Sequence, residues 1–155
     1  MAMDIMEGAV TKTTGAAAGA IISIVPAAIG SGHRMPEIRE IGIFNVSGVA
    51  AEIGLGIPAA LGTGGVSTNQ LVQDINNVGI TGLTNLVTAY VSTQPTAPTT
   101  FFRRAELQGV IGAGIIWTWG VGEWPIWSGA TVNAPVLWQL SAVAVTYDVY
   151  VKVAE

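Results

Sequence analysis

The chain has 155 residues with 6 Lys or Arg and 10 Asp or Glu, which gives a formal net charge of -4 at pH 7. It contains one histidine and no cysteine, and 50% of its residues are hydrophobic. This composition excludes a disulfide framework and a thiolate metal site, and it argues against binding of nucleic-acid phosphates, which needs clustered Lys and Arg. A soluble domain has about a quarter of its residues charged. We therefore expect much of this surface to contact other protein chains.

The first 32 residues are predicted to form an N-terminal arm that includes a first short strand around 21–25, and residues 33–155 are predicted to form one domain. Residues 13–32 carry no charge over about the length of a membrane helix. Small residues dominate this run and Pro26 interrupts it, so a membrane span is disfavoured. A secretory signal is also disfavoured, because residues 1–4 carry no positively charged side chain and Asp4 and Glu7 are acidic.

Two strands are predicted next from alternating apolar residues. Residues 37–44 and 49–57 are expected to form a hairpin across the turn-rich tetrad 45–48. The apolar parity changes between Ile38 and Ile41, which predicts a β-bulge between them.

The middle of the chain is less regular. Residues 62–69 are predicted to be a loop, and residues 70–77 either a short helix or a turn. The longest loop is expected at 92–100, mobile or folded onto a neighbouring chain. The remaining strands or extended segments are predicted at 83–91, 101–107, 110–119, 123–127 and 135–140.

The clearest strand is the last one, because its apolar residues recur with a period of two. One face is predicted to carry Val143, Val145, Tyr147, Val149, Val151 and Val153. The opposite face includes Thr146, Asp148 and Lys152. Short strands with Gly and Pro between them predict an all-β fold, namely an antiparallel β-sandwich of jelly-roll type with an N-terminal arm.

No set of residues matches a catalytic or metal-binding pattern. His33 is the sole histidine, so a zinc site or a histidine-based triad is not expected. Glu37 and Glu40 fall on opposite faces of a strand and make a poor acid and base pair. Asp148 and Glu106 are expected to be ion-pair partners at the surface or an interface. We predict no catalytic residues, no cofactor and no metal, and hence a protein that is not an enzyme.

Three further motifs are predicted to have no binding or modification role. Residues 54–59 match the G-x-G-x-x-A pattern of dinucleotide-binding loops, but Pro58 and the strand alternation argue against a helix there. Residues 62–65 lack the Lys of a phosphate loop. Residues 45–47 form a glycosylation sequon, which we interpret as a turn.

Five tryptophans form the most unusual feature of the sequence and are the candidate interface or ligand contacts: Trp117, Trp119, Trp124, Trp127 and Trp138. Trp117 and Trp119 share one face of a strand. A core or a subunit interface is favoured over a sugar-binding platform, because tryptophan buries a large area and supplies an N–H donor. The loop 120–125 is the segment of this region expected to be exposed.

Three segments, 39–45, 112–119 and 147–150 near the terminal Glu155, resemble small virion proteins encoded beside the capsid genes of tailed bacteriophages. The similarity covers most of residues 35–155, whereas the tryptophan-rich segment and the N-terminal arm diverge from it. The resemblance implies a β-rich subunit that decorates or stabilises a capsid, with no catalytic residues to carry over. It also implies localisation in a virion that is assembled in the host cytoplasm.

The sequence therefore predicts a homo-oligomeric structural virion protein, with a closed trimer favoured over a dimer or pentamer. Its expected partners are copies of itself and the major capsid or other virion proteins, and neither nucleic acid nor a membrane. The alternative is a carbohydrate-binding or host-attachment module that uses a tryptophan-rich surface. Buried tryptophan rings favour assembly, whereas coplanar exposed rings beside Asp, Asn or Gln favour sugar binding.

Overall fold

The computed structural model describes residues 5–26, 37–72, 81–123 and 134–154, and all the regular structure in these residues is β-strand. The ten strands are β1 (Ile5–Thr13), β2 (Gly19–Pro26), β3 (Glu37–Asn45), β4 (Ala51–Gly56), β5 (Thr63–Val72), β6 (Thr81–Thr93), β7 (Phe101–Leu107), β8 (Gly114–Thr118), β9 (Val136–Gln139) and β10 (Thr146–Ala154).

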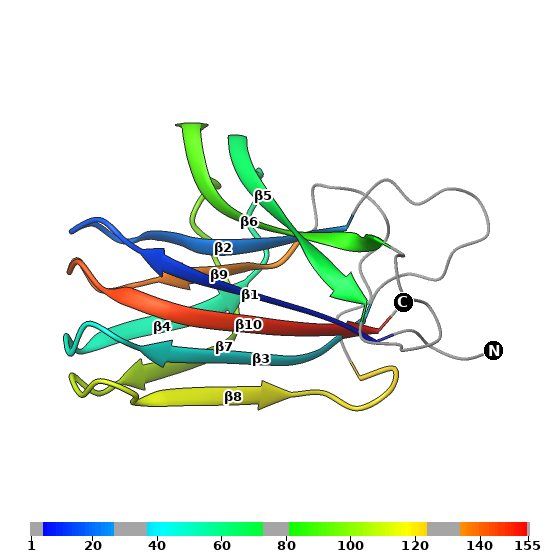
Figure 1. The fold of residues 1–155 in the computed structure, drawn as a ribbon. Coiled ribbons are helices and arrows are strands. Elements are labelled where there is room, and N and C mark those ends of the chain that lie inside the picture. Colours follow the sequence, from blue (N-terminus) through cyan, green and yellow to red (C-terminus); the bar gives the residue numbers. More distant parts are fainter. Residues whose placement is uncertain (1–4, 27–36, 73–80, 124–133, 155) are drawn as a thin grey trace.

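Eight strands form two four-stranded sheets that pack face to face as a sandwich (Figure 1). The first sheet has the order β1-β10-β3-β8, the second has the order β7-β4-β9-β2, and all their pairs are antiparallel. The predicted antiparallel β-sandwich is thus confirmed. The pair β5–β6 rises from one side and joins the sheets, because β5 pairs with β1 and β6 pairs with β2.

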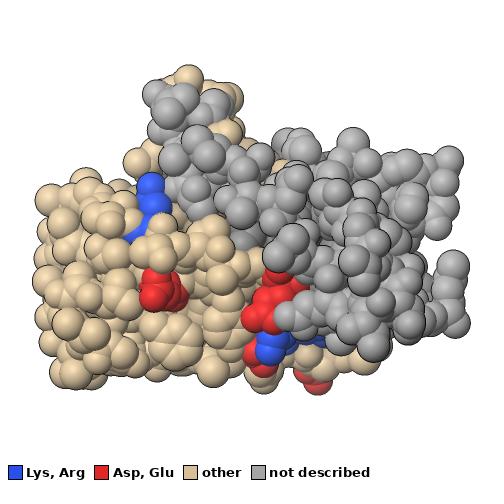
Figure 2. All heavy atoms as spheres, in the orientation of Figure 1, with Lys and Arg blue, Asp and Glu red and all other residues tan. Residues whose placement is uncertain are grey.

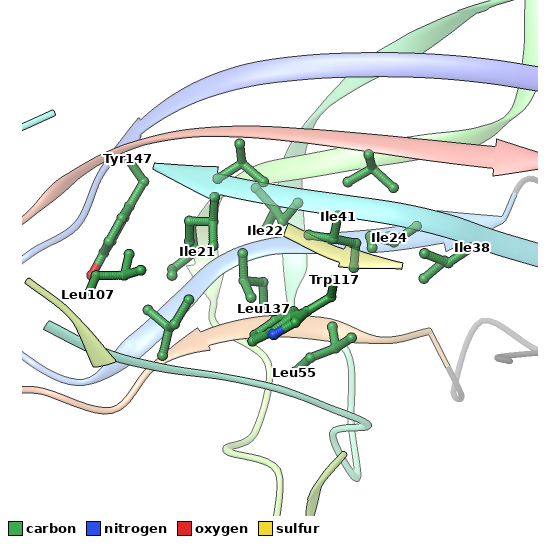
Figure 3. Close-up of a cluster of buried hydrophobic side chains, with 14 of the residues drawn as sticks. Ile21, Ile22, Ile24, Ile38, Ile41, Leu55, Leu107, Trp117, Leu137 and Tyr147 are labelled. Carbon is green, nitrogen blue, oxygen red and sulfur yellow. The ribbon is translucent and has the colours of Figure 1, made fainter. Parts of the chain in front are cut away.

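The core lies between the sheets and follows the predicted period of two. In and just before β10, Val145, Tyr147, Val149 and Val151 are at most 2% exposed, which confirms the predicted core face. Isoleucines and leucines of both sheets meet them (Figure 3): Ile21, Ile22, Ile24, Ile38, Ile41, Leu55 and Leu137. Each large side chain buried in this way contributes roughly 1.5–3 kcal/mol of transfer free energy.

The prediction of an N-terminal arm over 1–32 is wrong for the described residues. Residues 5–13 form β1, which pairs with β10 along its whole length, from Ile5 opposite Ala154 to Thr13 opposite Thr146. The strand has few large apolar side chains, so it is fixed by backbone pairing more than by an apolar face. Residues 1–32 and 33–155 are therefore not separate units in the described structure.

The first short strand predicted at 21–25 is confirmed within β2. Within the charge-free run 13–32, residues 14–18 form a loop and residues 19–26 form β2. Residues 27–32 lie outside the described residues. Among the residues that the structure describes, no helix is long and apolar enough to cross a membrane.

The predicted hairpin of 37–44 with 49–57 is wrong, although both strands exist. β3 pairs with β10 and β8 in the first sheet, whereas β4 pairs with β7 and β9 in the second. The tetrad 45–48 is a turn, but it carries the chain from one sheet to the other. The predicted bulge is confirmed, because Val153 is opposite Ile38 and Lys152 is opposite Glu40, which makes Arg39 the extra residue on β3.

The predicted loop at 62–69 is wrong, since Thr63–Val72 forms β5. Residues 70–72 belong to that strand, and the rest of the segment 70–77 lies outside the described residues. The predicted strands at 83–91, 101–107 and 135–140 are confirmed as β6, β7 and β9, and β8 is a shorter form of the one predicted at 110–119. In the segment predicted at 123–127, residues 124–127 are not described.

The loop at 92–100 folds back onto the outer face of the second sheet. Its Pro95 and Pro98 are buried, and the Gln94 side chain accepts a hydrogen bond from the Ala20 backbone N–H at 3.4 Å. A small second apolar cluster of Ala20, Val136 and Trp138 lies on this outer face. The two buried prolines therefore pack the loop against its own chain, and its contact with a neighbouring chain stays a prediction.

Our first prediction tests the face assignment of the core. Val149→Asp should destabilise the protein by several kcal/mol, because it buries a carboxylate without a partner. This loss of stability should be roughly ten times the loss from the same kind of substitution at an exposed site. Ile116→Asp on β8 is the matched control, since Ile116 is 50% exposed. The measurement is the melting temperature of the two variants, and equal losses would contradict the assignment.

Candidate functional site

Four loops lie together at one end of the sandwich, and none of their residues is charged. They connect β1 to β2 (residues 14–18), β3 to β4 (46–50), β7 to β8 (108–113) and β9 to β10 (140–145). They form the left end of the molecule in Figure 1, and the same end in Figure 2 shows no Lys, Arg, Asp or Glu on the visible face. We call this surface the charge-free end.

Large apolar side chains are exposed at the charge-free end. Ile111 is 70% exposed, Val110 is 64% exposed and Val49 is 40% exposed. The same four loops also carry small exposed residues: Ala16, Ala17, Ala18, Ala50, Ala142 and Ala144. Exposed apolar side chains on an uncharged surface make this end a candidate site for binding another molecule.

Asn45 holds two of the four loops in place from within the protein. Its side chain is fully buried, and its Nδ2 donates to the carbonyl oxygens of Val49 at 2.6 Å and Gln108 at 3.1 Å. Its Oδ1 accepts hydrogen bonds from the backbone N–H groups of Ser47 and Gly48. The loops 46–50 and 108–113 are thus connected through one buried amide.

Gln139 connects the other two loops, 14–18 and 140–145, from within the protein. Its Oε1 accepts hydrogen bonds from the Thr14 hydroxyl at 2.6 Å and the Tyr147 hydroxyl at 2.9 Å. Its Nε2 donates to the carbonyl oxygens of Ser141 and Val143. Burial raises the pKa of Tyr147, so its hydroxyl remains a hydrogen-bond donor at neutral pH.

These two amides make the charge-free end a preorganised surface. Of the four buried polar residues in the described structure, only Ser23 lies away from this end; the others are Thr14, Asn45 and Gln139. A buried amide is costly unless its hydrogen bonds are satisfied, and here each amide satisfies them by fixing loops. Loops fixed in this way lose little conformational entropy when a partner binds.

A polar rim lies beside the charge-free end on β4 and β7. Glu52 forms an ion pair with Arg104, and the Ser141 hydroxyl accepts a hydrogen bond from the Glu52 backbone N–H at 2.6 Å. An open hollow of about 470 Å³ is lined by Ala50, Ala51, Glu52, Arg104, Ala105, Glu106 and Ser141. An apolar centre with a polar rim is the usual anatomy of a protein interface.

Two of the three tryptophans that the structure describes are buried. Trp117 and Trp138 are each 7% exposed, Trp117 in the main core and Trp138 in the second cluster. Trp119 packs against the main core, and the Arg103 guanidinium lies over its ring at 5.9 Å from the centroid. Trp124 and Trp127 lie outside the described residues. The structure does not bring the described tryptophans together into one exposed platform.

The acidic residues considered in the sequence have structural partners. Glu37 forms an ion pair with Arg39 at 2.7 Å, and Glu40 forms one with Lys152 at 2.9 Å. Asp148 is exposed and accepts a hydrogen bond from the Thr11 hydroxyl at 2.6 Å. Glu106 is exposed on β7. His33 lies outside the described residues, and within the described ranges no three His, Asp or Glu side chains gather as a metal site would require.

The glycine pattern at 54–59 and the sequon at 45–47 both have structural roles. A Cβ on Gly54 would lie 2.5 Å from the Phe101 ring, and one on Gly56 would lie 2.6 Å from the Thr100 carbonyl oxygen. Close approach of a neighbouring segment therefore explains both glycines of the G-x-G pattern. The sequon residue Asn45 forms a turn as predicted, and its buried amide is committed to the loops.

No family of proteins, no curated protein and no solved structure matches this chain.

Our second prediction tests the role of Gln139. Gln139→Leu should destabilise the protein by roughly 1–3 kcal/mol, because it leaves the buried Tyr147 hydroxyl without its acceptor, whereas the Thr14 hydroxyl can still donate to the Val145 carbonyl oxygen. Gln108→Leu is the control, since Gln108 is an exposed glutamine in the same set of loops. Urea unfolding gives the free energies, and Tyr147→Phe should cost less in the Gln139→Leu background than alone. Equal losses from Gln139→Leu and Gln108→Leu would show that the amide does not support the loops.

Proposed function

We propose that this protein is a structural subunit of a virion, a homo-oligomer that binds and stabilises or decorates the capsid of a tailed bacteriophage. The observation that carries the proposal is the charge-free end, with Val110 and Ile111 exposed on loops that buried amides hold in place. Such a surface fits a protein partner, because burying its apolar area is favourable and little loop entropy is lost.

A jelly-roll topology supports the same proposal. When β5 and β6 are set aside as an insertion and the other eight strands are counted in chain order, the sheets read 1-8-3-6 and 5-4-7-2. This is the strand order of a jelly roll, an architecture that occurs in viral capsid proteins and in lectins. Fold alone does not define function, so this observation supports the charge-free end and does not replace it.

The mode of attachment that we propose is the charge-free end and not an N-terminal arm. β1 and β2 are strands of the two sheets, so the described part of the N-terminal segment is not available to reach a neighbour. Many copies that each bind the assembled shell weakly stabilise it by mass action and multivalency.

The phage origin and the closed trimer are proposals that rest on the sequence resemblance and on the low charge of the chain. The alternative of a sugar-binding module built on tryptophans has less support, because Trp117 and Trp138 are buried in the described structure. Assembly is therefore the function that the described geometry supports best.

Our third prediction concerns self-association through the charge-free end. Light scattering of the purified protein should show a closed oligomer, with a trimer expected, and Ile111→Asp should shift it toward the monomer because a carboxylate would have to be desolvated. Val121→Asp is the matched control, since Val121 is 78% exposed but lies on the segment after β8, outside the four loops. A monodisperse monomer for the unmodified protein at micromolar concentration would contradict self-association.

Our fourth prediction concerns the capsid. Added protein should co-sediment with purified shells that lack it and should raise the temperature at which the shells release their genome. Ile111→Asp should reduce occupancy on the shells by about tenfold or more, a loss of roughly 1.4 kcal/mol per site, whereas Val121→Asp should not. Shells whose resistance to heat and low salt is the same with and without the protein would remove the stabilising function.

A further inference from the structure

Two aromatic rings lie flat on the outer face of the first sheet, and one of them, Phe44, is next to the charge-free end because it directly precedes Asn45. Tyr150 is opposite Gly42 in the register, and Phe44 is opposite Gly114. A Cβ on Gly42 would lie 2.1 Å from the Tyr150 ring, and one on Gly114 would lie 2.2 Å from the Phe44 ring. Each ring therefore occupies the space above a glycine on the next strand.

The two rings form one surface because they lean in the same direction. Tyr150 leans from β10 onto β3, and Phe44 leans from β3 onto β8. Their centroids are 6.3 Å apart and their planes differ by 20°. Both side chains are partly exposed, so the rings are accessible to solvent on this face.

Polar groups line the side of the rings that faces β1. Since both rings lean away from β1, they leave an open hollow of about 300 Å³, lined by Ala9, Val10, Thr11, Phe44, Asp148, Val149 and Tyr150. Ala9 is opposite Tyr150 and Thr11 is opposite Asp148, so a small residue and a hydroxyl lie at this side of the hollow. The exposed Asp148 carboxylate accepts one hydrogen bond, from Thr11, and has acceptor capacity left.

Tyr150 is held rigidly in this arrangement. Its hydroxyl donates to Glu40 at 2.8 Å, and Lys152 donates to the same Glu40 oxygen at 2.9 Å. Burial and then the hydrogen bond to Glu40 raise the pKa of Tyr150, which keeps the hydroxyl protonated at neutral pH. The ring is thus available as a fixed apolar surface, while its polar end is already satisfied.

The charges on this face indicate a neutral ligand. Glu7, Glu40 and Asp148 lie on it together with Lys152, so an anion would meet an excess of negative charge. The Tyr150 ring already has a cation from its own chain, because the Lys152 ammonium lies 5.5 Å from the ring centroid, so a cationic ligand would have to compete with Lys152 for that ring. A neutral ligand with one apolar face and several hydroxyl donors avoids both the excess negative charge and the competition with Lys152.

We infer that this hollow binds a neutral saccharide, with a sugar ring packed against Phe44 and Tyr150 and its hydroxyls donating to Asp148. The Thr11 hydroxyl is the second polar contact. This site is independent of the tryptophans and of the proposed capsid function, because it uses a different face of the molecule from the charge-free end.

The test is titration of the intact protein with a panel of neutral tetrasaccharides of glucose, galactose, mannose and N-acetylglucosamine, followed by calorimetry and by saturation-transfer NMR. At least one member should bind, and Tyr150→Ala and Asp148→Asn should each weaken its binding by about tenfold or more. Tyr150→Phe should retain binding, since it keeps the ring and removes only the hydroxyl.

Phe102→Ala is the matched control, because Phe102 is 39% exposed on β7 in the other sheet. It should leave the affinity unchanged, and melting temperatures show whether each variant is folded. Absence of binding by every tetrasaccharide at 10 mM, on the order of the weakest affinities that a single small site gives, would overturn the inference. Binding that Tyr150→Ala and Asp148→Asn leave unchanged would also overturn it, as would stronger binding of choline than of any sugar.

Discussion

The arrangement of the charge-free end depends on one constraint: a buried amide must satisfy its hydrogen bonds within the protein. Asn45 meets this requirement with backbone groups of the loops 46–50 and 108–113. Gln139 meets it with two carbonyl oxygens of the loop 140–145 and with the Thr14 hydroxyl. The loops are therefore fixed from the interior of the protein. This explains how exposed valine, isoleucine and alanine can be held in a defined arrangement before any partner binds.

The strands that could be predicted from the sequence are those with strong apolar alternation. β10 and β4 alternate large aliphatic residues with small or polar ones, and their core faces follow from that pattern. β1 and β5 could not be predicted in this way, because they contain many Gly, Thr and other small or polar residues and are defined by backbone pairing with distant strands. The strands that pair with β3 could not be predicted from the local sequence either, because the turn after β3 leads to the opposite sheet and not to a hairpin partner.

The charge-free end was missed in the sequence for a similar reason. Its four segments are separated by 26 residues or more of intervening strand and loop, as from 18 to 46 and from 50 to 108, and only the topology brings them together. The sequence did contain one signal, namely that all four connections lack charged residues. In an antiparallel fold alternate connections fall at the same end, so these four could have been expected to lie together. The pair Phe44 and Tyr150 gave no such signal, since its exposure depends on Gly42 and Gly114 across the sheet.

The sheet edges bear on how copies of the subunit could associate. β7 is the edge of the second sheet, and it carries Arg103, Arg104 and Glu106, which oppose the addition of a strand from another chain. The register also shifts between Leu55 and Gly56, where β7 has Phe102 as an extra residue, and such a bulge further disrupts an edge. An edge of this kind does not favour strand pairing between copies, which is consistent with the proposal that copies associate through the charge-free end. A subunit built in this way leaves the outer face of the first sheet free, so assembly at one end and ligand binding on that face can occur together.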